Sequence, residues 1–156
     1  MKIYLLRHGE AVERYESDRT RPLSDNGIKE IRKIGEFLKK GNVLIDKIYS
    51  SPLFRAYQSA MIIGKEINFN DDIVELDLLL PESKPDEVLS YLSQIDYSSV
   101  LLVTHQPLIG SLVSILIFGR NYTLRINKST LVCIEVNKNF DPKNATLQFL
   151  VNPEIL

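Results

Sequence analysis

Cysteine and histidine are scarce in this chain, and its net charge is close to zero. The 156 residues include one cysteine, Cys133, and two histidines. A single cysteine excludes an internal disulfide framework and a cysteine-based zinc site, and two histidines argue against a histidine-rich metal site. Lys and Arg number 19 against 20 Asp and Glu, so the formal charge is −1. We therefore expect neither nucleic acid nor a membrane surface as a partner.

Long apolar runs are also missing. The most apolar stretch, Leu108–Phe118, is about half of the ~20 residues needed to span a bilayer. The run Ile3–Leu6 is much shorter than the core of a signal peptide. These two observations predict a cytoplasmic protein. The length of 156 residues is that of one ordinary domain, so we expect a single domain covering residues 1–156.

Five segments have the composition of β-strands. Continuous apolar runs predict buried strands within residues 2–6, 43–50 and 100–104, and the second is clearest at 47–50. Residues 130–136 and 145–151 are rich in β-branched side chains and predict two more strands. Turn-forming residues between these two predict a hairpin at an edge of the sheet: Asn139, Asp141, Pro142 and Asn144.

Four helices are predicted between these strands. Ser24 suits the N-cap of the first, and Gly41 suits the left-handed position after its end. Ser51-Pro52 predicts the N-cap and first turn of the second helix. An amphipathic pattern at residues 85–95 predicts the third, and Pro107 begins the fourth. Strands that alternate with helices imply an α/β fold with a largely parallel sheet.

The two histidines and two arginines stand where predicted strands end. Arg7, His8 and Gly9 follow the first strand, Arg55 comes one turn after the second, and His105 follows the third. Ligands of open α/β sheets bind at the carboxyl ends of the strands, where helix N-termini also point their N–H groups. Guanidinium groups bind tetrahedral oxyanions, neutral imidazole can be a nucleophile, and glycine lets the backbone approach a ligand. Together these features predict a phosphate pocket, although each of them alone has an ordinary structural explanation.

Three segments that contain these residues carry a family resemblance. They read LRHGE at residues 6–10, SSPLFRAYQSA at 50–60 and VTHQP at 103–107. In this order they resemble the RHG, SSPLxRAxQTA and VGHxP motifs of the histidine phosphatase superfamily, the phosphoglycerate mutase-like proteins. The short length and the segments at 18–27 and 79–92 resemble its SixA-type phosphohistidine phosphatase branch. The resemblance implies a three-layer α/β sandwich and a covalent phosphohistidine enzyme intermediate. Because two arginines, His105 and helix N-termini can stabilise the charge of the transferred group, we expect neither a cofactor nor a metal.

The resemblance also implies a role for each matched residue. His8 corresponds to the nucleophile that becomes phosphorylated, and Arg7 and Arg55 correspond to the pair that clamps the phosphoryl oxygens. His105 corresponds to the second histidine of the phosphate pocket. Arg21 corresponds to a further phosphate or substrate contact, and the alternative is an ordinary loop charge.

The chain departs from the family pattern at two places. Thr104 replaces a glycine, which brings a side chain next to the predicted pocket. Mutase-type relatives have a glutamate as proton donor, whereas Leu78 stands nearest that position here. Asp77 and Glu82 are the neighbouring candidates for the donor.

A weak proton donor bears on the choice of substrate. An alkoxide leaving group needs a proton, whereas imidazole leaves more readily because its conjugate acid has a pKa of about 6.5. We therefore expect a phosphohistidine-containing protein as the substrate. Two alternatives stay open: a small-molecule phosphomonoesterase or mutase of the same superfamily, and a non-catalytic module that binds phosphate or a phosphoprotein. The sequence does not indicate the oligomeric state.

Overall fold

A six-stranded sheet forms the centre of the computed structural model, which describes residues 1–137, 139–140 and 144–156. The strand order is β3-β2-β4-β1-β5-β6. The strands are β1 (Lys2–Arg7), β2 (Lys47–Ser50), β3 (Val74–Glu75), β4 (Ser99–Thr104), β5 (Leu131–Glu135) and β6 (Thr146–Val151). The pairs β1–β4, β4–β2 and β2–β3 are parallel, whereas β5 pairs antiparallel with β1 and β6 pairs antiparallel with β5. This confirms the largely parallel sheet. The predicted turn residues Asp141 and Pro142 lie outside the described residues.

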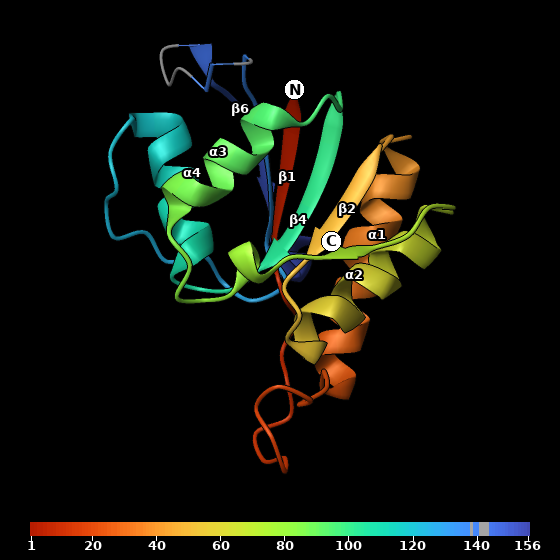
Figure 1. The fold of residues 1–156 in the computed structure, drawn as a ribbon. Helices are drawn as coiled ribbons and strands as arrows, with labels where there is room; N and C mark the ends of the chain where they lie inside the picture. Colours follow the sequence, from red (N-terminus) through yellow and green to blue (C-terminus); the bar gives the residue numbers. More distant parts are fainter. Residues whose placement is uncertain (138, 141–143) are drawn as a thin grey trace.

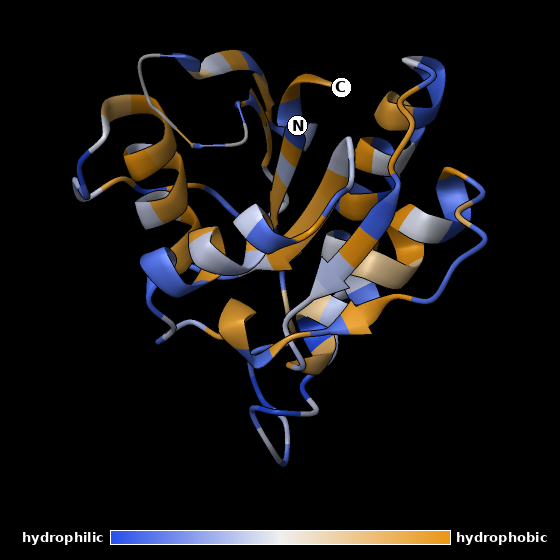
Figure 2. Ribbon diagram, turned by 45° about the horizontal axis from the view of Figure 1, so that its top comes forward, coloured by the Kyte–Doolittle hydropathy of each residue, from blue (hydrophilic) through white to orange (hydrophobic). Residues whose placement is uncertain are grey.

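Two pairs of helices cover the two faces of this sheet (Figure 1). They are α1 (Asp25–Lys40) and α2 (Phe54–Glu66) on one face, and α3 (Pro85–Gln94) and α4 (Leu108–Phe118) on the other. Because successive strand residues point to opposite faces, Ile3 and Leu5 pack with α3 and α4, whereas Tyr4 and Leu6 pack with α1 and α2. The apolar segments accordingly lie along the strands and the helix faces toward the sheet (Figure 2). The predicted three-layer α/β sandwich is confirmed.

The first helix begins as predicted, but the left-handed residue after its end lies one position later than expected. The Ser24 hydroxyl accepts a hydrogen bond from the Gly27 N–H at 3.1 Å, which makes Ser24 the N-cap. The left-handed position after α1 was expected at Gly41. Gly41 is instead the C-cap with φ −76°, and Asn42 has φ 50°. Asparagine tolerates this backbone region better than most residues, so the turn does not need glycine there.

The start of the second helix differs from the prediction. Ser51-Pro52 is not the N-cap, because α2 begins at Phe54 and its N-cap is Leu53, which makes no side-chain capping bond. The Phe54 N–H donates to the Arg19 carbonyl at 2.9 Å, so a distant loop supplies one acceptor for the helix start. The Ser51 hydroxyl is left for another contact, described below.

The buried fourth helix matches its prediction. Pro107 is the N-cap of α4, and Gly119 ends the helix with φ 69°, a left-handed conformation that suits glycine. α4 has 11 residues. Within the described part of the chain, no helix combines the length and apolar composition needed to cross a membrane.

Candidate active site

Neighbouring strands bring the two histidines together. β1 and β4 pair in parallel with Arg7 opposite Thr104, so His8 and His105 are the next residues of adjacent strands. The His8 N–H donates to the Thr104 carbonyl at 3.1 Å, which extends the pairing by one step. The two imidazole centroids are 4.7 Å apart, and the rings are inclined at 56°. The chain thus places two imidazoles in contact, tilted toward each other, at the carboxyl edge of the sheet.

A pocket of about 280 Å³ opens at this edge. Its lining consists of Arg7, His8, Ala11, Arg21, Arg55, Pro81, His105, Gln106 and Lys128. Every side chain predicted to bind phosphate is in this set, and within the described residues no carboxylate lines the pocket. A larger hollow of about 630 Å³ lies at the opposite end of the sheet, beside Lys2 and Ser99, and contains none of the predicted residues.

The ring of His8 is held in one tautomer. Its Nδ1 lies 2.6 Å from the Gly9 carbonyl oxygen, and a carbonyl can only accept, so Nδ1 carries the hydrogen. Burial and, to a smaller extent, the positive charges of Arg55 and Arg7 lower the pKa of His8 to about 3, although the Gly9 hydrogen bond opposes this. At neutral pH the ring is therefore uncharged, with its lone pair on Nε2. A neutral imidazole with a free Nε2 is a competent nucleophile.

His105 is oriented by Ser51. The Ser51 Oγ lies 2.8 Å from Nε2 of His105 and accepts a hydrogen bond from the Leu53 N–H at 3.3 Å. When the hydroxyl hydrogen is donated to Nε2, the ring hydrogen of His105 is on Nδ1. Burial, with smaller contributions from His8 and the arginines, lowers the pKa of His105 to about 2. Its buried Nδ1 has no hydrogen-bond partner among the described residues. His105 is therefore a neutral ring with one uncommitted nitrogen.

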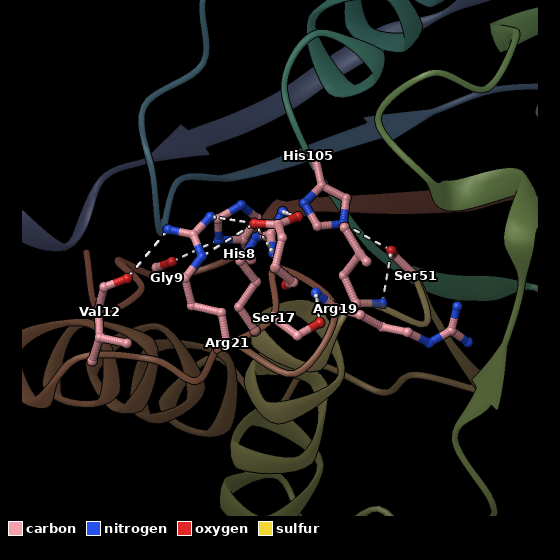
Figure 3. Close-up of polar contacts among 11 residues, drawn as sticks. His8, Gly9, Val12, Ser17, Arg19, Arg21, Ser51 and His105 are labelled. Carbon is pink, nitrogen blue, oxygen red and sulfur yellow. Dashed lines mark hydrogen bonds and ion pairs between the residues drawn. The ribbon is translucent and has the colours of Figure 1, made fainter. Parts of the chain in front are cut away.

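One carboxylate joins two of the pocket's arginines, of which Arg21 is labelled in Figure 3. Arg55 donates to the Asp18 carbonyl at 2.9 Å, and its two Nη atoms each lie 3.3 Å from a carboxylate oxygen of Asp18. Arg21 donates to the same carboxylate from Nε at 3.2 Å and from Nη2 at 2.8 Å. Burial raises the pKa of Asp18, but the hydrogen bonds and charges of the two arginines outweigh burial and leave the pKa lowered. Asp18 therefore stays ionised and holds both guanidinium groups at the pocket.

Arg7 is fixed from the other side. Its Nη1 donates to the Ile126 carbonyl at 2.6 Å, while its buried Nε has no partner among the described residues. Burial lowers the pKa of Arg7, as it does that of Arg55, but a guanidinium remains charged at any physiological pH. Hydrogen bonds within the protein thus hold the positive charge of the arginines at the pocket. No cluster of three or more potential metal ligands occurs among the described residues.

Gly9 serves a different purpose from the one expected. It was predicted to let the backbone approach a ligand, but it does not line the pocket. A Cβ at this position would lie 2.9 Å from Cγ1 of Ile31 and 3.0 Å from the Gly27 carbonyl oxygen, both in α1. Its missing side chain therefore lets the loop pack against α1. The Gly9 N–H donates to the Ser59 hydroxyl at 3.2 Å, so the carbonyl that holds His8 is itself positioned.

The two candidate proton donors lie outside the pocket. Asp77 and Glu82 are exposed, and neither is part of the lining, although Pro81 between them is. Leu78, which stands at the position of the family's donor, packs against the apolar core. The side chain of Thr104 does not narrow the pocket either, because it is fully buried and donates to the Leu79 carbonyl at 2.7 Å.

Lys128 and Gln106 also line the pocket, and the sequence reasoning did not single them out. Lys128 lies in the loop before β5, which runs antiparallel to β1. The start of an antiparallel neighbour lies at the carboxyl end of the parallel strands. The loop before the predicted hairpin therefore lies at the edge where ligands of α/β sheets bind, and this could have indicated Lys128 from the sequence.

Comparison with known sequences assigns the family. Residues 3–89 match the histidine phosphatase superfamily (branch 1), and the chain belongs to this superfamily. It is 34% identical to the phosphohistidine phosphatase SixA of Escherichia coli K12 over 117 residues, which are 73% of each chain. A SixA homolog of Haemophilus influenzae is 30% identical over 131 residues, which are 78% of this chain and 80% of that protein.

Comparison with solved structures agrees with this assignment. The protein histidine phosphatase SixA complexed with tungstate superimposes with a TM-score of 0.91 at 29% identity, over 99% of each chain. A putative alpha-ribazole-5'-P phosphatase from Escherichia coli superimposes with a TM-score of 0.77 at 19% identity, which is a likeness of fold alone. The fold is therefore shared beyond the SixA proteins.

Proposed function

We propose that this chain is a phosphohistidine phosphatase, which removes a phosphoryl group from a histidine side chain of a protein through a phosphorylated His8 intermediate. One observation carries the proposal: neutral His8, with Nδ1 committed to Gly9, faces a pocket lined by four cations and, among the described residues, by no carboxylate. Similarity to SixA proteins supports it. So does the tungstate complex of one of them, because tungstate is a tetrahedral oxyanion like phosphate.

The first chemical step transfers the phosphoryl group to His8. The Nε2 lone pair attacks phosphorus, a new N–P bond forms, and the bond to the substrate's imidazole breaks with its electron pair on the departing nitrogen. A proton on the other ring nitrogen of the substrate lets this ring leave as neutral imidazole. Arg7, Arg55 and the Nδ1–H of His105 offset the negative charge on the phosphoryl oxygens. A water molecule then attacks phospho-His8, which releases inorganic phosphate and restores the neutral ring.

The absence of a lining carboxylate among the described residues favours an N–P substrate. Imidazole leaves without strong acid assistance, whereas an alkoxide depends on a proton. A panel of a phosphohistidine protein, a phosphoserine peptide, a phosphotyrosine peptide and a sugar phosphate tests this through kcat/KM. We expect the phosphohistidine protein to be the best substrate and the alkyl phosphates to be poor. Efficient hydrolysis of the sugar phosphate would instead support a small-molecule phosphomonoesterase, and tungstate binding without any turnover would support a binding module.

The proposed mechanism needs no metal ion, because Arg7 and Arg55 supply the positive charge. We expect a chelator such as EDTA to leave kcat/KM unchanged, and vanadate or tungstate to inhibit by occupying the phosphoryl position. Activity that is lost on chelation and restored by a divalent cation would contradict the proposal. The cytoplasmic location predicted from the sequence stays a prediction, which cell fractionation would test.

A further inference from the structure

Lys128 lies between two hollows at the carboxyl edge of the sheet. It lines the phosphate pocket together with His8 and Arg7. It also lines a neighbouring hollow of about 270 Å³, which it shares with Arg7 and Glu10. Its side chain is exposed, and its ammonium makes no hydrogen bond or ion pair with another described residue. It is therefore a cation beside the nucleophile that no close contact within the described residues holds in place.

The backbone next to Lys128 is hydrogen-bonded directly to the backbone of Arg7 and His8. The Ser129 N–H lies 3.1 Å from the Arg7 carbonyl oxygen and 3.2 Å from that of His8, and the Arg7 N–H donates to the Thr130 carbonyl at 3.1 Å. Ser129 is fully buried and has φ 60°, which is uncommon for a residue other than glycine. Its hydroxyl donates to Glu30 at 2.7 Å. The surrounding structure thus imposes a turn that fixes where Lys128 leaves the backbone.

The charge of Lys128 reaches both hollows. In the phosphate pocket it adds to the lowering of the His8 pKa, after burial and the two arginines. In the other hollow it adds to the lowering of the Glu10 pKa, after the hydrogen bonds from Ser24 and Asn26. A long, flexible ammonium placed between a carboxylate and an anion pocket can turn toward either one.

We infer that Lys128 is a further phosphoryl-binding residue of this site, whose ammonium donates to an oxygen of the substrate's phosphoryl group. The inference rests on the proposed function, because it assigns a ligand contact within the same pocket. Arg21 and Arg55 are both engaged by Asp18, which offsets part of their charge. Lys128 acts on Glu10 through its charge but forms no close ion pair among the described residues, so a bound dianion would be the direct acceptor of its ammonium.

Titration of the full-length chain with tungstate in a calorimeter tests the inference without relying on turnover. Lys128→Met removes the charge and keeps most of the stem, and Lys128→Arg keeps the charge. Arg125→Met is the matched control, because Arg125 is exposed on the same loop but lines a different hollow, with Gln106 and Pro107. We expect Lys128→Met to weaken tungstate binding roughly tenfold, the low end for a hydrogen bond to a charged group. Lys128→Arg and Arg125→Met should stay within about twofold of the unmodified chain, since the arginine keeps the contact and Arg125 makes none.

Two results would overturn the inference. One is tungstate binding by Lys128→Met within twofold of the unmodified chain. The other is an equal loss of tungstate affinity in Lys128→Met and Arg125→Met. That result would mean that the positive charge of the loop acts at a distance, without a contact to the anion. Measurement of kcat/KM with a phosphohistidine protein separates this inference from the proposed function. If the unmodified chain binds tungstate without hydrolysing phosphohistidine, the proposed function fails and the titration still decides the role of Lys128.

Discussion

The wall and the rim of the phosphate pocket are built differently. The wall consists of His8, Arg55 and His105, which are at most 7% exposed and are each held by a partner within the protein. The rim consists of Arg21, whose side chain is 28% exposed, and Lys128, which is exposed. Fixed, buried donors stabilise developing charge without rearrangement, whereas exposed side chains lose rotamer entropy when they bind. We therefore assign the chemistry to the wall, and at the rim we assign adjustable binding to Lys128, because Arg21 is held by Asp18 and the Val12 carbonyl.

The largest expected effect comes from removing the wall's nucleophile. His8→Ala should lower kcat by about 10⁴-fold or more, because the covalent route is lost. Tungstate binding should persist, since the cations that surround the anion remain. Mass spectrometry of samples quenched without acid should find phosphate on His8 in the unmodified chain. Normal turnover by His8→Ala would exclude the covalent mechanism and contradict the assignment of the chemistry to the wall.

A smaller loss is expected when a wall residue loses its support. Ser51→Ala removes the hydroxyl that fixes the tautomer of His105, and kcat/KM should fall roughly 10- to 100-fold, as for other groups that orient a functional histidine. Ser50→Ala is the matched control, because Ser50 is equally buried but donates to the Ser51 carbonyl instead of to a pocket residue. Equal losses in the two variants would mean that Ser51 acts through packing alone.

The buried histidines should also make the folded state sensitive to acid. The pKa values of His8 and His105 are lowered to about 3 and about 2, whereas an unfolded histidine titrates near 6.5. As the pH falls from 6.5 toward 3, the unfolded chain therefore binds more protons than the folded one, and the free energy of unfolding decreases. The loss between pH 7.5 and pH 5 is roughly 2 kcal/mol for each histidine.

Urea unfolding at pH 7.5 and pH 5 measures this dependence. His105→Gln should lose roughly 2 kcal/mol less than the unmodified chain between these two pH values. The difference between the pH values is the informative quantity, because the substitution also changes stability at both. An identical pH dependence in the two proteins would show that His105 is not buried in its neutral form.

The smallest effects are expected outside both regions. Asp77→Asn and Glu82→Gln should change phosphohistidine turnover less than about threefold, far from the 10²–10⁴-fold typical of a lost general acid. Both residues are exposed and neither lines the pocket. A large loss of kcat/KM in either variant would show that this residue acts as a general acid, although it belongs to neither the wall nor the rim.

The parts of the fold predictable from sequence are those with local causes. The apolar runs that became β1 and β4 are buried on both faces, which leaves a continuous hydrophobic pattern. The cap at Ser24 depends on contacts within four residues. Because ligand sites follow strand ends, the same local reading placed His8 and His105 at one edge of the sheet.

The features that were missed depend on partners far along the chain. Ser51 has the sequence of a helix cap, but its hydroxyl contacts His105, 54 positions away, and the start of α2 moves to Phe54. Asp18 takes its role from Arg55, 37 positions away. The missing side chain of Gly9 is explained by its neighbours in α1. None of these contacts leaves a local pattern, so composition and periodicity do not reveal them.

The distance between the two imidazoles has a simple origin. Their centroids are 4.7 Å apart, close to the spacing of about 4.8 Å between any two neighbouring strands. The separation therefore follows from the pairing of β1 and β4, and the contacts with Gly9 and Ser51 fix how each ring is turned. Histidines placed after equivalent positions of two adjacent parallel strands would be similarly spaced in an unrelated sheet, which suggests a rule for designing such pairs into new scaffolds.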